Sequence, residues 1–364
     1  MNTDLLKRLC ETPGIPGREE RIRALIEKEV KGLFDEVRTD PMGNLLCRRD
    51  PRARRTSSAR KTTKKKTSSG GRATRVMLAC HMDEIGFYVK AIDDKGFIRI
   101  QPAGGFDARN MFSRRVLVCG QGGDIIGAMN PGGRPIHISS PEERSKVPEV
   151  KDFFIDIGLP AADVRRKVRV GDMIVWHEPF EEVGQKVVSK ALDNRIACWL
   201  GIESVRALEK SGVAHACELH VAFTVQEEVG LRGARTAGAA VEPDLAIGLD
   251  TTLACDTPGV PSDESVTKQG EGAVLHVMDA SIISDYRLIN ELEDVAKKKR
   301  IKVQRSILPR GGQDGAAMQQ AMKGCRAAGL AVGTRYIHSV TEMIHKADLE
   351  AARDLLAAWI PTVK

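Results

Sequence analysis

The order of helical and extended segments is the feature that most constrains this fold. In the second half of the 364-residue chain, apolar periodicity predicts alternating elements: helices at 193–208, 287–300 and 347–359, and strands at 219–225, 245–249 and 328–332. Such alternation favours an α/β sheet with helices on both faces. Residues 87–178 differ, because short strands there are separated by glycine and proline turns, a pattern typical of a compact β-rich unit.

This β-rich unit interrupts the α/β pattern. An amphipathic helix at 18–33 and a short buried strand at 76–81 precede it. We therefore predict a discontinuous α/β domain at 1–86 and 179–364, with a β-rich domain inserted at 87–178.

The positive charge of the chain is concentrated in one segment. The formal net charge is +7, yet twelve Lys or Arg residues and one acid lie between Arg48 and Arg75, so the remainder is slightly acidic. Residues 52–72 contain no large apolar residue, which predicts a flexible basic arm. The arm has no aromatic residue for base stacking, and this argues against specific nucleic-acid recognition.

Other features indicate the compartment. No run approaches the ~18 apolar residues that a membrane span requires, and residues 1–8 lack the apolar stretch of a signal peptide. The eight cysteines are scattered without a C-x-x-C pair. We expect a cytoplasmic protein without membrane contact, disulfides or a thiolate zinc site.

Acidic and histidine side chains collect where predicted strands end. His81 and Asp83 follow the strand at 76–81, and residues two apart on an extended chain face the same way. His81 can therefore bind a metal while Asp83 accepts the other ring N–H. Glu227 and Glu228 follow the strand at 219–225, where adjacent buried acids require a nearby cation. One of them can bind a metal while the other acts as a general base.

Three further side chains are compatible with the same chemistry. Asp193 precedes a helix and is either its N-cap or a carboxylate that bridges two metals. Asp250 and His338 each lie near a predicted strand end. Taken singly, each is as consistent with a structural role as with a functional one. Together the set offers two histidines and several carboxylates. This mixture of nitrogen and oxygen ligands suits zinc, cobalt or manganese.

Several ordered motifs resemble one family. Residues 81–86 (HMDEIG), 192–195 (LDNR), 226–230 (QEEVG) and 335–339 (RYIHS) are similar to those of the TET-type aminopeptidases, which include glutamyl, leucyl and deblocking enzymes and some proteins once labelled endoglucanases. The resemblance covers roughly 3–50 and 75–360. It implies a mixed-sheet α/β metallopeptidase domain with a small PDZ-like β-domain used in assembly, and a homo-oligomer that is a hollow tetrahedral dodecamer.

The resemblance also implies roles for individual residues. Asp193 would bridge two divalent metal ions, with zinc or cobalt expected and manganese as an alternative. The other ligands and catalytic groups would be Glu228 and His338 at one metal, His81 and Asp250 at the other, Glu227 as general base, and Asp83 as the partner of His81. The expected activity is removal of the first residue from peptides with a free N-terminus.

Three departures from the family pattern and two alternative functions remain. The basic arm at 52–72 is longer than the loop expected there. Gln313 stands where a threonine is expected, and His345, where an acid is expected, is interpreted as a surface residue near a helix start. Two carboxylates would also serve a glycosidase, although that chemistry needs neither a bridging aspartate nor two histidines. A non-enzymatic polyanion-binding protein could use the basic arm through salt-sensitive phosphate attraction.

Overall fold

The middle of the α/β domain is a set of parallel strands that are buried on both faces. The computed structural model describes residues 1–53 and 72–364, so the predicted arm at 52–72 lies outside the described residues except at its two ends. The central strands, in spatial order, are β12 (Glu218–Thr224), β3 (Arg75–His81), β13 (Leu245–Leu253) and β16 (Arg326–Arg335). Their near-continuous apolar sequences fit strands that are covered on both sides.

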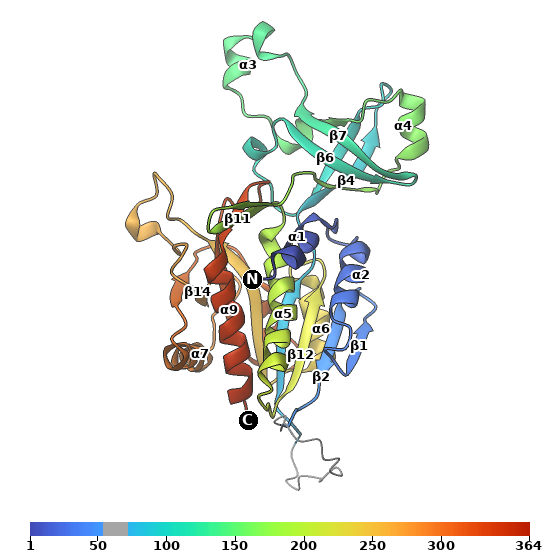
Figure 1. Cartoon of the computed structure of the whole chain (residues 1–364). Coiled ribbons are helices and arrows are strands. Elements are labelled where there is room, and N and C mark those ends of the chain that lie inside the picture. The colour runs from blue at the N-terminus through green and yellow to red at the C-terminus, as the bar shows by residue number, and fades with distance from the viewer. Residues whose placement is uncertain (54–71) are drawn as a thin grey trace.

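Antiparallel strands extend this sheet at both edges and make it mixed, as predicted. One edge carries β2 (Leu45–Arg49) and β1 (Glu36–Thr39), and the other continues through β17 (Glu342–His345), β11 (Lys186–Ser189) and β10 (Glu181–Val183). A side branch is formed by β14 (Ala273–Met278), which pairs with β16 and with β15 (Val303–Ile307). Figure 1 shows the sheet running through the lower body of the molecule.

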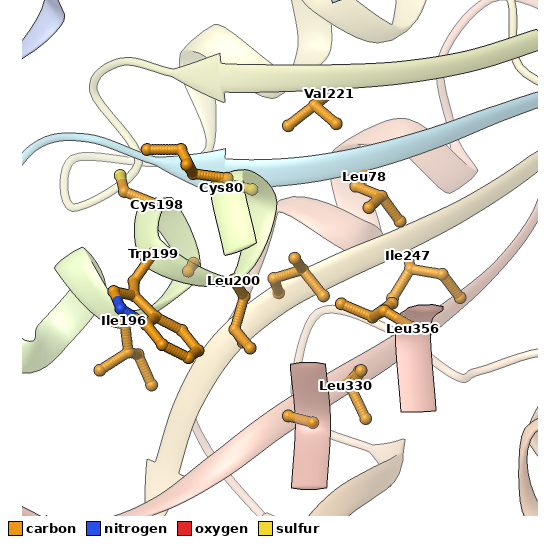
Figure 2. Packing of buried hydrophobic residues seen from close by; sticks show 14 of the residues in the cluster. Leu78, Cys80, Ile196, Cys198, Trp199, Leu200, Val221, Ile247, Leu330 and Leu356 are labelled. Atoms are coloured by element: carbon orange, nitrogen blue, oxygen red, sulfur yellow. The ribbon is translucent and has the colours of Figure 1, made fainter. Parts of the chain in front are cut away.

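Helices cover both faces of the sheet. The larger core contains residues of α1 (Thr3–Glu11), α2 (Glu20–Glu29), α5 (Leu192–Ser211), α7 (Tyr286–Lys299) and α9 (Lys346–Trp359). In Figure 2, Leu200 of α5 and Leu356 of α9 lie against Ile247 and Leu330 of the central strands. A smaller core on the other face is formed with α6 (Arg232–Val241) and α8 (Asp314–Gln319).

The inserted domain is a closed six-stranded barrel. Its strands are β4 (Gly86–Ile92), β5 (Ile98–Ala103), β6 (Arg114–Gly120), β7 (Gly123–Pro131), β8 (Phe153–Asp156) and β9 (Met173–Trp176). They pair in the order β4-β5-β8-β7-β6-β9 around their own apolar core. Closure leaves no free strand edge. Two short helices lie in the connections between barrel strands: α3 (Pro141–Ser145) between β7 and β8, and α4 (Ala161–Lys167) between β8 and β9. α3 lies on a segment that projects from the barrel (Figure 1).

The barrel is joined to the α/β domain close to the end of a central strand. β3 ends at His81, and β4 begins at Gly86, so four residues connect the two. Arg52 and Arg72, at the ends of the undescribed segment, are attached to the opposite part of the domain: Arg52 exchanges backbone hydrogen bonds with His215, and Arg72 forms an ion pair with Asp244. Within 1–53 and 72–364, no helix has the length and apolar character needed to cross a membrane.

Candidate metal centre

The predicted ligands meet at the edge of the sheet where the parallel strands end. His81 is the last residue of β3, Glu227 and Glu228 follow β12, and Asp250 lies in the second half of β13. Because the carboxyl ends of parallel strands share one edge, these side chains converge. Asp193 at the start of α5 and His338 after β16 complete the cluster, which lines a cleft of about 550 Å³.

The Asp193 carboxylate lies between the two histidine rings. Its Oδ1 is 3.5 Å from His81 Nε2, and its Oδ2 is 3.6 Å from His338 Nε2. The helix-cap interpretation of Asp193 is wrong, since the cap hydrogen bond at the start of the regular part of α5 is made by the neighbouring Asn194, whose Oδ1 accepts from the backbone N–H of Ala197 at 3.2 Å. A carboxylate that directs one oxygen to each of two imidazoles has the arrangement of a bridging ligand.

The other carboxylates divide between the two histidines. Glu228 Oε2 is 3.3 Å from His338 Nε2, whereas Glu227 Oε2 and Asp250 Oδ1 are 3.7 Å and 3.9 Å from His81 Nε2. Two groups of three side chains each bring their candidate ligand atoms within 4.8 Å of one another. The first group is His81, Asp193 and Glu228, and the second is His81, Glu227 and Asp250. The structure thus brings together in one cleft the five predicted metal ligands and the predicted base Glu227.

Asp83 contacts the site differently from the sequence prediction. The Nδ1 atom of His81 is 3.1 Å from the backbone carbonyl of Asp83 and 3.6 Å from its carboxylate. The carboxylate instead accepts hydrogen bonds of 3.1 Å from the backbone N–H groups of Glu227 and Glu228. The His81–Asp83 contact leaves His81 Nε2 facing the cluster, and Asp83 positions the two glutamates.

The cluster carries excess negative charge in a buried setting. Burial and neighbouring carboxylates raise the pKa of Glu227 and of Asp250 well above the ordinary range. Burial disfavours the charged ring of His338, but Glu228 and Asp193 outweigh it and raise the pKa of this histidine to about 10. Carboxylates crowded in this way are stabilised by a cation.

The donor atoms fit divalent metal ions. Glu228 Oε1 is buried and has no hydrogen-bond partner among the described residues, and a buried carboxylate oxygen is expected to have one. The neighbouring donors are imidazole nitrogens and carboxylate oxygens, which suit zinc, cobalt or manganese. The unpartnered oxygen together with this donor set is compatible with bound metal.

Two acids in the site had no signal in the sequence. Glu342, the first residue of β17, accepts hydrogen bonds from the backbone N–H groups of Asp193 at 2.9 Å and His338 at 2.8 Å. Asp314, at the start of α8, is buried and accepts a hydrogen bond from Thr224 at the end of β12. Neither acid follows an apolar strand, so the rule that selected the other carboxylates could not find them.

Of the three departures from the family pattern, the basic arm lies outside the described residues except at its ends, and Gln313 and His345 lie outside the ligand sets. Gln313 is buried, and its side chain packs against Gly248 of β13 and Gly329 of β16. His345 is a partly exposed residue at the start of α9, where its Nδ1 accepts a hydrogen bond from the backbone of Ala347. The interpretation of His345 as a residue near a helix start agrees with this position.

Solved structures that are similar over nearly the whole of this chain include aminopeptidases, and a Thermotoga maritima relative, 25% identical with a TM-score of 0.76 and 98% of this chain and 96% of that chain covered, carries the name endoglucanase. A TET aminopeptidase from a Thaumarchaeota archaeon is 32% identical, with 99% of this chain and 95% of that chain covered and a TM-score of 0.89. The TET1 peptidase of Pyrococcus horikoshii, which can assemble into a tetrahedron or a large octahedral shell, is 29% identical with 98% of both chains covered and a TM-score of 0.83. A further TET1 relative, 29% identical with a TM-score of 0.82 and 99% of both chains covered, is a dodecamer.

Sequence comparison agrees with this class. A putative aminopeptidase of Acetivibrio thermocellus is 34% identical over 358 residues, which cover 98% of each chain. The sequence model of the M42 glutamyl aminopeptidase family matches residues 62–355. The chain therefore belongs to the M42 glutamyl aminopeptidase family and is a peptide hydrolase, which favours the peptidase over the glycosidase and polyanion-binding alternatives.

Proposed function

We propose that this chain is an aminopeptidase that acts through two divalent metal ions. Asp193 would bridge the two ions, Glu228 and His338 would hold one, and His81 and Asp250 would hold the other. The observation that carries the proposal is the Asp193 carboxylate, whose two oxygens are 3.5 Å and 3.6 Å from the two imidazoles. Zinc or cobalt fits this donor set, and manganese is an alternative.

The catalytic step assigned to the chain itself is proton transfer by Glu227. When bound, the metals supply Lewis-acid activation of water and of the carbonyl after the first residue. Glu227 removes a proton from the attacking water and delivers it to the leaving amine as the C–N bond breaks. One water is consumed, and the N-terminal amino acid and the shortened peptide are released. Asp83 keeps Glu227 and Glu228 in place through their backbone N–H groups.

We further propose that the barrel directs assembly into a closed homo-oligomer, a dodecamer. The segment at 132–149, which includes α3, projects from the barrel (Figure 1) and carries exposed Ile136, Ile138 and Val147. Phe112 is also exposed and lines one cavity together with Ile136. An apolar surface of this kind is typical of a protein–protein contact. The metal ligands all lie in the α/β domain, so assembly through the barrel leaves them free for peptides.

Glu227→Gln tests the role of the base. The amide keeps the size of the side chain but cannot take a proton, so we expect both metals to remain bound while turnover of aminoacyl nitroanilides falls by about 100- to 10,000-fold. Metal content by elemental analysis and steady-state kinetics measure the two effects. The matched control is Glu264→Gln, which makes the same change at an exposed position outside the cleft and should leave both quantities unchanged.

Asp193→Ala tests the bridge. Loss of the shared carboxylate should release at least one metal per subunit, and activity should fall with it. Full metal loading of the purified Asp193→Ala protein would show that Asp193 is not the bridging ligand.

A further inference from the structure

A second cavity adjoins the cleft over the candidate metal ligands. This side cavity has a volume of about 940 Å³, and it shares the wall residues Leu253, Leu308 and Arg310 with the metal cleft. None of the candidate ligands is among the described residues that line the side cavity. A molecule bound at the metal positions can therefore extend past the shared wall into a space that has no part in the metal chemistry.

The wall of the side cavity is largely apolar, and part of it is open to solvent. Ile307, the last residue of β15, is 61% exposed, and Leu253 of β13 is 39% exposed. Charged residues of both signs also line the space, so charge alone selects no ligand. Exposed apolar side chains that gather around a cavity are typical of a binding surface. The apolar wall residues are Leu253, Val266, Val277, Ile307, Leu308 and Pro309.

Buried hydrogen bonds hold one wall of the side cavity in place. The hydroxyl of Ser306, which lines the cavity, is 2.9 Å from Nδ1 of His276 on β14. The other ring nitrogen of His276 is 3.2 Å from the carboxylate of Asp279, and all three residues are buried. Where β15 ends, the backbone N–H of Leu308 donates to the carbonyl of Met278 at 2.9 Å. The cavity is therefore preformed, which lowers the ordering cost of binding.

The two spaces suit different parts of a peptide. The metal cleft has its own apolar residues, Leu231 and Ile337, which do not line the side cavity and can contact the first side chain of a substrate. The side cavity is close to the upper end of the ~300–1,000 Å³ range of small-molecule pockets, which is more than one amino-acid side chain fills. Space for several residues beside the metal cleft fits the part of a peptide that follows the cleaved bond.

We propose that the side cavity binds the third and fourth residues of a peptide substrate and favours apolar side chains there. This inference rests on the proposed function, because it requires the first residue to lie at the metal positions. An extended peptide advances about 3.3 Å per residue, so a chain that leaves the metal cleft past Leu253 and Leu308 places the residues after the second in the side cavity. The consequence is a preference for longer apolar peptides that does not depend on which residue is removed.

The experiment uses three substrates of the wild-type metal-loaded protein that all begin with leucine. Leucyl-glycyl-leucyl-leucinamide and leucyl-glycyl-glycyl-glycinamide have the same length and no terminal carboxylate, and they differ only in the side chains of the third and fourth residues. Leucyl nitroanilide ends before the side cavity. We expect the initial rate of the first cleavage to give a kcat/KM about 10- to 100-fold higher for the leucine-containing peptide, mainly through a lower KM.

Ile307→Glu tests the wall residue. A charge in the apolar wall should reduce this preference by about 10-fold, and turnover of leucyl nitroanilide should not change. Ile307→Ala, which removes apolar area without adding a charge, should reduce the preference less. Because the Ile307 side chain is largely exposed, neither variant should impair folding. Ile283→Glu, the matched control, makes the same change at an isoleucine that is 68% exposed and lines neither space.

A binding measurement separates this proposal from the catalytic one. In calorimetric titrations of the metal-loaded Glu227→Gln protein, the leucine-containing peptide amide should bind more tightly than the glycine-containing one. Adding Ile307→Glu should reduce this difference, and adding Ile283→Glu should leave it unchanged.

The negative results have different meanings. Equal kcat/KM values for the two peptides in the wild type, or a preference that Ile307→Glu leaves unchanged, would overturn the side-cavity proposal while hydrolysis of leucyl nitroanilide leaves the aminopeptidase assignment standing. An equal loss on all three substrates in Ile307→Glu would also overturn it, since the change would then act on the metal cleft. If the wild-type metal-loaded protein hydrolyses none of the three substrates, the proposed function fails, and the inference fails with it.

Discussion

Asp83 and Glu342 each accept hydrogen bonds with both carboxylate oxygens from backbone N–H groups of candidate site residues. Asp83 accepts the N–H groups of Glu227 and Glu228, and Glu342 accepts those of Asp193 and His338. The backbone around the candidate metal ligands is therefore held by two acids that lie outside the proposed ligand set. Sequence reasoning found Asp83 through its spacing from His81, but Glu342 contacts Asp193 across 149 positions, and no local pattern encodes such a pair.

Glu342→Ala should weaken metal binding. Removing the carboxylate frees the N–H groups of Asp193 and His338, and loss of such outer contacts typically lowers metal affinity by about 10- to 100-fold. Glu342→Gln keeps one carbonyl oxygen as an acceptor and should lose less. Competition with a chelator measures the affinity, and Asp354→Ala, which removes an exposed carboxylate from α9, is the control. Unchanged affinity in Glu342→Ala would refute this positioning role.

Glu19 predicts how stability depends on pH. Burial and the nearby Asp83 carboxylate raise the pKa of Glu19 to about 7. The folded protein therefore holds this proton more tightly than the unfolded chain, and the free energy of unfolding should decrease as pH rises from the ordinary carboxyl pKa to about 7, on the order of 1 kcal/mol per pH unit. Below this window both states are protonated, and above it the cost is constant.

Glu19→Gln should remove this cost. One oxygen of Glu19, Oε1, accepts the N–H groups of Gly17 at 2.8 Å and Gln226 at 3.1 Å, and the glutamine carbonyl can accept both. We expect the variant to be more stable than the wild type at pH 8 and to match it near pH 4, as measured by thermal unfolding at each pH. A constant difference across this range would contradict the raised pKa of Glu19.

At the scale of elements, the loop before α8 packs against β13 and β16 where each strand has a glycine. Gly248 and Gly329 are register partners on the two strands, and a Cβ atom on either would collide with the Gln313 side chain. Gly329→Ala should therefore lower the free energy of unfolding by about 1–3 kcal/mol. Adding Gln313→Thr, the residue expected from the family pattern, should restore part of it, while His276 Cβ, 2.9 Å from the new methyl group, limits the recovery.

Chemical denaturation of the two single variants and the double variant measures this coupling. If Gly329→Ala lowers the free energy of unfolding equally in the wild type and in the Gln313→Thr background, the clash with the Gln313 side chain is not the cause of the destabilisation. The comparison also tests why the family pattern and this sequence differ at that position.

Periodicity identified the long elements and missed the short ones. The helices at α5, α7 and α9 and the strands β3, β12, β13 and β16 lie close to their predicted positions because each buries a regular apolar face. The edge strands β1 and β10 were not predicted, since all their residues are exposed and local sequence carries no burial pattern there. The predicted helix at 18–33 is shorter in the structure, where α2 ends at Glu29 ahead of Gly32 in a left-handed conformation.

At the scale of the whole molecule, the exposed apolar segment of the barrel predicts the assembly state. Wild-type protein should sediment as a large closed oligomer, and Ile136→Glu or Ile138→Glu should produce smaller species, because a charge at a buried contact is costly. Val213→Glu, at an exposed apolar position of the α/β domain, is the matched control and should not change sedimentation. A wild type that is monomeric and fully active would refute assembly through the barrel.

Because the α/β domain is interrupted by the barrel, the parts of the candidate active site are made at different times during translation. The barrel is contiguous, from β4 to β9, and all of its strands leave the ribosome before α5 has been made. Domains fold as units in the order of translation, so the barrel is available early. His81 emerges before the barrel and His338 after β16, and the central sheet is incomplete until that strand arrives. A growing chain therefore lacks part of the proposed ligand set until β16 and His338 have been made, and it should be inactive as a peptidase until then.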